Sequence, residues 1–67
     1  MRLKILAKDS NRGEQGCPSI HRDEDSGRSV FQGPGVDMAH MPNALPGEQA
    51  VVLDEAVLRA AVRALGW

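Results

Sequence analysis

The stretch that decides the fold is residues 17–37, CPSIHRDEDSGRSVFQGPGVD, which reads as a β-hairpin. Two short runs with β-branched and aromatic residues, 19–22 and 28–32, flank the polar cluster DEDSG at 23–27. The cluster ends in glycine, which tolerates a positive φ, and its length is typical of a three- to five-residue hairpin loop. The sequence therefore predicts a hairpin over 19–32 that the rest of the chain covers.

The register of this hairpin decides which residues face the core. Pairing that is symmetric about the middle of the loop places Ile20 opposite Val30 and Arg22 opposite Arg28, and the acidic loop offsets the two facing cations. If Ile20 and Val30 face inward, Phe31 lies on the outer face as an exposed contact residue. The alternative is that a helix covers the face of Phe31 and that Val30 points outward. An exposed aromatic side chain on so small a domain predicts a partner interface.

The length and composition limit the class of protein. The chain has 67 residues and one cysteine, so it forms a single small domain, 1–67, without an intrachain disulfide. A domain of this size buries only about 60% of the surface of its unfolded chain, so we expect a protein partner, self-association or a metal to add stability, or else a thin core that is sufficient alone. A net charge of −1 does not indicate a positively charged surface that would bind nucleic acid or an anionic membrane.

The same composition predicts a cytoplasmic protein. A single cysteine favours a reducing compartment, because small secreted domains usually carry paired cysteines. Lysines interrupt the apolar residues of segment 1–8, and no stretch reaches the length of a signal peptide or a membrane span.

The remaining segments supply a second strand region and a helix. Residues 3–7 predict an edge strand with Leu3, Ile5 and Ala7 on one face, and segment 8–16 has no apolar residue and reads as a flexible loop. Residues 37–41 can form one helical turn whose two methionines cover one end of the sheet. The sequence LPGE at 45–48 predicts a type II turn that leads into an apolar strand, 49–53, near the sheet centre.

The helix predicted over residues 55–65 has apolar residues at helical spacing and arginines on the opposite face. Asp54 is its expected N-cap, Gly66 its left-handed C-terminal residue, and Trp67 is expected to fold back on Val62. The fold class is therefore α+β, with a small three- or four-stranded, mainly antiparallel sheet and one C-terminal α-helix packed on it.

Three groups of chemically active residues give weaker sequence signals than the fold does. Cys17, His21 and His40 are the only candidates for a metal site, but Cys17 and His21 lie about 13 Å apart on an extended strand, so we expect no metal and no other cofactor. The same residue types supply two possible nucleophilic sets, Cys17 with His40 and Asp37, and Ser19 with His21 and Asp23. So short a chain offers little volume for a substrate pocket, so we do not expect an enzyme.

Four arginines, at positions 22, 28, 59 and 63, could alternatively form a surface for nucleic acid. Nine carboxylates are interspersed with them, which favours a solvated mixed surface instead. Nucleic-acid binding and a metal-stabilised structural domain are thus the two alternatives to protein binding.

A resemblance adds a possible context. The sequence GCPSI at 16–20, the glycine turn at 27, VFQG at 30–33, Val36, LPGE at 45–48 and the valines at 51–52 resemble a family of short actinobacterial proteins of unknown function. That resemblance covers roughly residues 8 to 53, and those proteins tend to be encoded beside helix-turn-helix regulators. The chain departs from the family in the GPG sequence at 33–35 and in a longer alanine-rich final helix. The resemblance implies an accessory protein of a regulatory or toxin–antitoxin-like locus that acts through a protein partner.

The sequence therefore favours a small cytoplasmic protein-binding accessory module that modulates a DNA-binding regulator. Its candidate partner-binding residues are Phe31, Gln32, Arg22 and Arg28.

Overall fold

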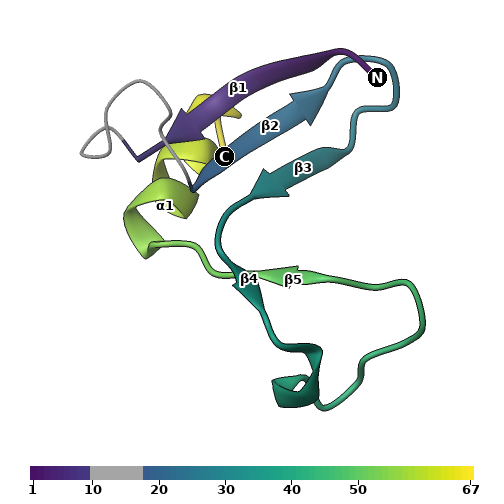
Figure 1. The fold of residues 1–67 in the computed structure, drawn as a ribbon. Helices are drawn as coiled ribbons and strands as arrows, with labels where there is room; N and C mark the ends of the chain where they lie inside the picture. Colours follow the sequence, from purple (N-terminus) through teal and green to yellow (C-terminus); the bar gives the residue numbers. More distant parts are fainter. Residues whose placement is uncertain (10–17) are drawn as a thin grey trace.

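The computed structural model describes residues 1–9 and 18–67, and it confirms the α+β class (Figure 1). One antiparallel sheet has the strand order β1-β2-β3 and the bounds Leu3–Lys8, Ser19–Asp23 and Ser29–Gln32. The helix α1, Glu55–Ala64, packs mainly on β1 and β2. A separate two-stranded sheet pairs β4, Gly35–Val36, with β5, Ala50–Val51.

The hairpin β2-β3 is present, but the register predicted for it is wrong by one residue. Ile20 lies opposite Phe31, His21 opposite Val30, and Arg22 opposite Ser29. The loop has four residues between Asp23 and Arg28, and Gly27 adopts a φ of 75° within it. A one-residue shift moves every side chain of a strand to the other face, so Phe31 shares the face of Ile20. Because of the shift, Arg22 and Arg28 do not lie opposite each other, contrary to the prediction from the symmetric pairing.

Strand β1 contains an irregularity that changes the predicted arrangement of its side chains. Ile5 lies opposite His21 and Ala7 opposite Ile20, so the register shifts at Leu6, as in a β-bulge. Ala7 therefore faces α1, whereas Leu3 and Ile5 point to the opposite face of the sheet. The expectation that Leu3, Ile5 and Ala7 share one face is wrong for this reason.

The hydrophobic core is small and lies between the sheet and α1. Its buried members are Ala7 and Ile20 from the sheet and Val57 and Ala61 from the helix, and three partly buried side chains pack against them: Leu6, Leu53 and Ala60. Val57 and Ala61 are four residues apart on one helix face, as the periodicity predicted.

The helix α1 begins after Asp54 and ends close to the predicted residue. Asp54 has the extended backbone of an N-cap residue, although its side chain makes no capping hydrogen bond. At the other end, Gly66 has a φ of 77°, and the amide of Trp67 donates to the carbonyl of Val62 at 3.1 Å, which is the Schellman pattern. The side chain of Trp67 is 84% exposed, so its predicted packing on Val62 is wrong.

The predicted strand 49–53 does not join the main sheet. Instead, residues 35–51 form a separate arm that contains β4, a 3-10 helix at Met38–His40, a turn at 45–48 and β5 (Figure 1). The turn has the predicted type II features, because the amide of Glu48 donates to the carbonyl of Leu45 and Gly47 has a φ of 85°. The arm bends away after Gly33 and Pro34, since Pro34 has no amide proton to continue the ladder.

The arm leaves the molecule less compact than is usual for its size. The radius of gyration is 12.8 Å, against about 11 Å for a compact chain of this length. The solvent-accessible area is 5265 Å², about 1,100 Å² more than expected for a folded chain of this mass. No helix among the described residues is long and apolar enough to cross a membrane.

The junction between β3 and the arm, at Gly33, leads to a first prediction. A Cβ atom on Gly33 would lie 2.7 Å from the carbonyl oxygen of Val52 and 3.3 Å from the Cβ of Pro18, so Gly33→Ala must displace backbone. We expect it to lower the free energy of unfolding by about 1–3 kcal/mol. Gly35→Ala, which meets nothing within 4 Å, is the matched control. Urea unfolding of both variants checks the prediction, and equal midpoints would contradict it.

Candidate functional site

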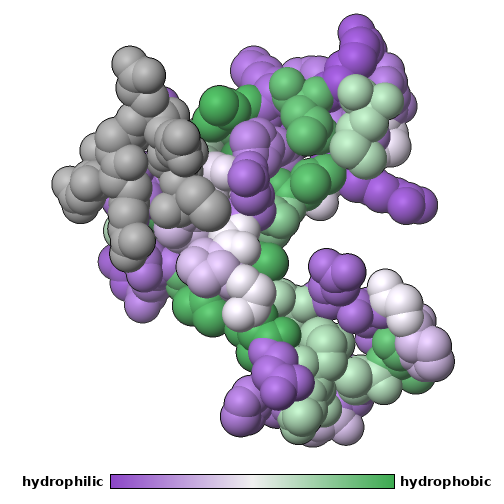
Figure 2. All heavy atoms as spheres, in the orientation of Figure 1, coloured by the Kyte–Doolittle hydropathy of each residue, from purple (hydrophilic) through white to green (hydrophobic). Residues whose placement is uncertain are grey.

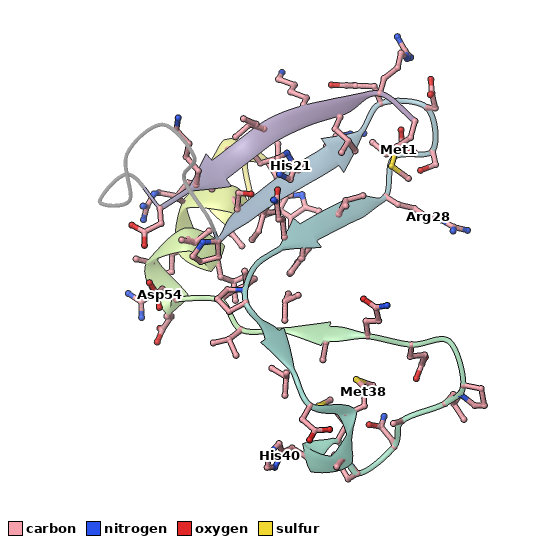
Figure 3. The ribbon with its side chains drawn as sticks, viewed as in Figure 1. Met1, His21, Arg28, Met38, His40 and Asp54 are labelled. Carbon is pink, nitrogen blue, oxygen red and sulfur yellow. The ribbon has the colours of Figure 1, made fainter. Side chains whose placement is uncertain are left out.

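The predicted partner-binding residues lie on different faces of the hairpin. Phe31 is on the helix side of β3 and is 45% exposed, because α1 lies mainly over β1 and β2. Gln32 points to the opposite face, and Arg22 lies on the helix side opposite Lys4. Arg28 is exposed where the loop joins β3 (Figure 3). Phe31 is therefore neither fully buried in the core nor on the outer face.

The backbone of β3 is available at the edge of the sheet. The amide of Asp23 donates to the carbonyl of Arg28 at 2.8 Å, which marks these two residues as a hydrogen-bonded pair. Because such pairs alternate along an antiparallel ladder, the backbone groups of Ser29 and Phe31 point away from β2. Among the described residues, no backbone hydrogen bond outside the strand ladders uses them.

The two edges of the sheet are protected differently. Strand β1 carries Lys4 and Lys8, and lysine on an edge strand discourages pairing with another chain. Strand β3, Ser29–Gln32, has neither a charged residue nor a proline. The edge of β3 is thus the place where an additional strand meets the least obstruction.

A notch lies beside this edge. Figure 2 shows the molecule hollowed between the main sheet and the arm, with β3 on one side of the hollow (Figures 1 and 2). The main contacts of β4 and β5 are with each other, so the arm stands away from the sheet. An extended segment of another protein can therefore reach β3 from this side.

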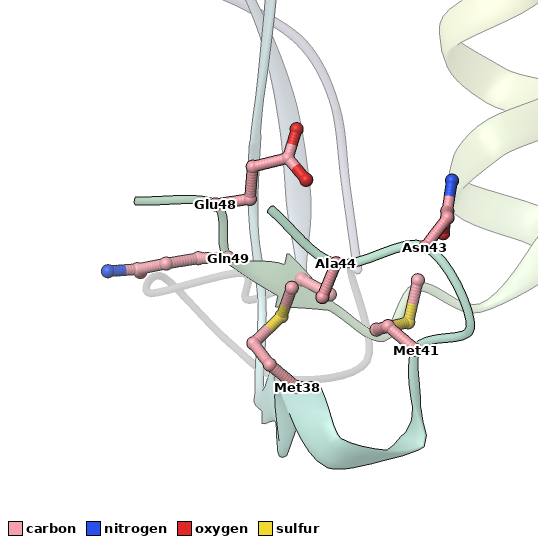
Figure 4. A pocket seen from close by; sticks show the side chains of 7 residues that line it. Met38, Met41, Asn43, Ala44, Glu48 and Gln49 are labelled. Carbon is pink, nitrogen blue, oxygen red and sulfur yellow. The ribbon is translucent and has the colours of Figure 1, made fainter. Parts of the chain in front are cut away.

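The arm itself encloses a shallow cavity of about 340 Å³ (Figure 4). The predicted role of the two methionines is wrong, since they line this cavity instead of covering the end of the sheet. Its volume also exceeds what we expected of so short a chain. The lining residues are Met38, Met41, Asn43, Ala44, Glu48, Gln49 and Ala50. The carboxylate of Glu48 accepts a hydrogen bond from the amide of Leu45 at 2.9 Å, so it closes the turn.

Two cations near the hairpin end, Arg22 and Arg28, have no acidic partner among the described residues. Asp25, which we expected to offset them, instead lies 2.7 Å from Nε of Arg2. Neither Arg22 nor Arg28 forms a described ion pair, and Arg22 lies opposite Lys4. Lys4 and Arg22 therefore place two positive charges side by side on the helix side of this end of the sheet.

The four arginines do not form one surface. Arg28 lies at the hairpin end of the sheet, whereas Arg59 and Arg63 are on α1 at the other end (Figures 1 and 3). Nε of Arg59 also donates to the carboxylate of Glu55 at 3.0 Å. Within the described part of the chain, these four arginines thus give the nucleic-acid alternative no continuous basic face.

The histidines are far apart and do not complete a site. His21 lies in β2 and His40 in the 3-10 helix of the arm (Figure 3), while Cys17 lies outside the described residues. In the described ranges, 1–9 and 18–67, no group of three His, Cys, Asp or Glu residues could hold a metal ion. The absence of a metal and of a cofactor remains a prediction.

One of the two predicted nucleophilic sets, Ser19 with His21 and Asp23, is present in part. Oγ of Ser19 and Nε2 of His21 are hydrogen-bonded at 2.9 Å, but Ser19 is buried. The carboxylate of Asp23 is occupied by the hairpin loop, and the carboxylate of Asp37 accepts from the amide of Ala39 at 3.0 Å. The arrangement therefore presents no oriented and accessible serine nucleophile.

The side chain of Asp23 holds the hairpin loop closed. Its side chain accepts from Oγ of Ser26 at 2.7 Å and from the amides of Asp25 and Arg2 at 3.1 and 3.2 Å. The residue is only 5% exposed. The hydrogen bond from Ser26, followed by those from the backbone amides, lowers the pKa of the Asp23 carboxyl below its ordinary value.

Sequence reasoning missed two features of this region. The outward backbone groups of Ser29 and Phe31 follow from the register, which the loop residues alone did not specify. The outward direction of Leu3 and Ile5 follows from the irregularity at Leu6, and the alternating pattern of β1 carries no signal of a bulge.

The lowered pKa of Asp23 gives a second prediction. Its unfolded carboxyl binds a proton near the ordinary value of about 3.9, whereas the folded carboxyl binds one only at lower pH. The stabilisation is thus present above the unfolded pKa and is lost as pH falls through the folded pKa. We expect Asp23→Asn to lower the Tm at pH 7. Between pH 5 and pH 2, the Tm of this variant should fall less than the Tm of the wild type. Asp54→Asn, whose side chain makes no capping hydrogen bond, should retain the wild-type profile; identical profiles for both variants would contradict the prediction.

Comparison with known proteins gives no match to a family, to a curated protein or to a solved structure. The resemblance to the actinobacterial family accordingly stays a prediction.

Proposed function

We propose that the protein is a small protein-binding accessory domain whose partner binds along the edge of β3. The observation that carries this proposal is the combination, on one short strand, of free backbone groups and a half-exposed aromatic side chain at Phe31. Main-chain hydrogen bonds from such an edge supply affinity, and side-chain contacts supply specificity. Phe31 is the anchor, since aromatic residues are enriched among the side chains that dominate binding energies.

The charges around the edge support a partner segment of particular chemistry. Arg28 precedes β3, and Arg22 lies beside Ser29 on the helix side of the sheet. An extended segment with an apolar residue against Phe31 and an acidic residue toward these arginines complements both features. Rim charges of this kind mainly accelerate encounter and exclude wrong partners.

The cellular setting is part of the same proposal. A single cysteine favours the cytoplasm, and the resemblance to proteins encoded beside helix-turn-helix regulators makes a DNA-binding regulator the first partner to test. The domain would then modulate that regulator through its β3 edge.

A proline substitution tests the use of the edge. The amide of Ser29 points away from β2, so Ser29→Pro removes a donor from the free edge and leaves the hairpin ladder intact. We expect its folded far-UV circular dichroism spectrum to be retained and its affinity for the partner to fall at least about tenfold, or about 1.4 kcal/mol. Val30→Pro is the contrasting variant, because the Val30 amide belongs to the β2-β3 ladder and its loss should unfold the domain.

Replacement of the anchor is the companion test. We expect Phe31→Ala to weaken binding by about 2 kcal/mol without unfolding the domain, since the side chain is half exposed. The measurement is affinity capture from source cells with the full chain as bait, identification of the bound protein, and calorimetry with that protein. Trp67→Ala, the loss of another exposed aromatic, is the control. Unfolding of Phe31→Ala would show the side chain to be core, and equal capture by all variants would place the partner elsewhere.

A further inference from the structure

A row of three hydrogen-bond donors crosses the helix side of the main sheet at its hairpin end. Lys4 lies opposite Arg22, and Arg22 lies opposite Ser29, so the three side chains point to the same face from β1, β2 and β3. All three residues are exposed. We call Lys4, Arg22 and Ser29 the cationic row.

The guanidinium of Arg22 extends toward the hairpin loop. A Cβ atom placed on Gly27 would lie 3.9 Å from Nη2 of Arg22, and it would meet no other described atom within 4 Å outside the adjoining residues. The guanidinium thus borders open space where the loop has no side chain, and a small ion can reach its N–H donors there.

The carboxylates at this end of the sheet do not neutralise the row. Those of Asp23 and Asp25 bind the hairpin loop and the beginning of the chain instead. Neither Lys4, Arg22 nor Glu24 forms an ion pair among the described residues. Two positive charges therefore lie side by side without a counter-charge from the described part of the chain.

This arrangement lowers stability unless an anion binds to it. Like charges that lie directly opposite each other in a sheet are destabilising. An oxyanion beside them accepts charge-assisted hydrogen bonds from both cations, and the planar fork of an arginine matches two oxygens of a phosphate. The hydroxyl of Ser29 lies opposite Arg22 and supplies a further donor.

We propose that the cationic row binds a phosphate group that carries two negative charges. Its charge matches the two cations, and its oxygens match the donors of Lys4, Arg22 and Ser29. The phosphate is either a free ion or the phosphorylated side chain of a segment bound along β3. The first source goes beyond the proposed function and does not depend on it, whereas the second rests on that function and names the acidic group of the partner.

Titration of the full chain with inorganic phosphate at constant ionic strength tests the site, with nuclear magnetic resonance of the backbone amides as the readout. We expect saturable shifts at the amides around the row. Arg22→Gln should weaken binding at least about tenfold, because it removes the guanidinium fork. Lys4→Gln is the second variant, and it should weaken binding in the same direction. Arg63→Gln is the matched control, since Arg63 is an exposed arginine of α1 without an ion pair among the described residues.

Thermal unfolding gives a second readout that a merely structural role of Arg22 would not produce. In phosphate-free buffer of low ionic strength, Arg22→Gln should raise the Tm, because it removes the repulsion from Lys4. Addition of phosphate should raise the Tm of the wild type and leave that of Arg22→Gln nearly unchanged, since a ligand stabilises only a folded state that binds it.

Each result decides the proposal. Saturable binding that Arg22→Gln weakens and Arg63→Gln preserves supports it. Shifts that do not saturate, or equal weakening by these two variants, overturn it. The same holds for a Tm that phosphate raises equally in the wild type and in Arg22→Gln.

A titration with a short capped peptide of alternating valine and phosphoserine separates the two sources. Tighter binding than that of inorganic phosphate, with a loss of this advantage in Phe31→Ala, assigns the site to a phosphorylated partner segment. Affinity no greater than that of inorganic phosphate assigns it to the free ion. Phe31→Ala should leave the binding of inorganic phosphate unchanged, so failure of the β3 edge and failure of the cationic row are distinguishable.

Discussion

The carboxylate of Asp23 is the constraint on which the rest of the structure depends. It accepts hydrogen bonds from the loop that follows it and from the amide of Arg2, so it ties the hairpin to the beginning of β1. A loop closed in this way sets the register of β2 and β3, and a register shift of one residue exchanges the two faces of a strand. The loop that Asp23 holds closed joins β2 and β3 in the register that puts Phe31 on the face of Ile20 and the backbone groups of Phe31 at the free edge.

The bulge at Leu6 has a comparable effect on the other edge strand. Without it, the alternation of side chains along a strand would place Leu3, Ile5 and Ala7 on one face. With it, Ala7 joins Ile20, Val57 and Ala61 in the core, and the two larger side chains lie outside. The domain consequently has a small core and an apolar outer face.

The arm and the sheet together give the molecule two distinct surfaces. The edge of β3 opens on the notch and offers backbone groups, an aromatic side chain and two arginines without an ion pair among the described residues. The sheet face that points away from α1 carries Leu3 and Ile5, both about half exposed. The β3 edge suits an extended segment of a different protein.

The local signals in the sequence determined the elements. Helical spacing predicted α1, Gly66 predicted its end, the cluster DEDSG predicted the hairpin loop, and LPGE predicted the type II turn. These features depend on residues close together in the chain, so a single sequence displays them. The tertiary structure decided three features: the register at Phe31, the bulge at Leu6 and the separation of β5 from the main sheet. The register at Phe31 depends on which residues of β2 and β3 pair across the four-residue loop. The bulge and the separation of β5 involve contacts between distant segments, namely the packing of Ala7 beneath α1 and the close approach of Gly33 to Val52. The candidate surfaces follow from those contacts, because the face on which a strand residue lies is set by its pairing partner and not by its neighbours in sequence.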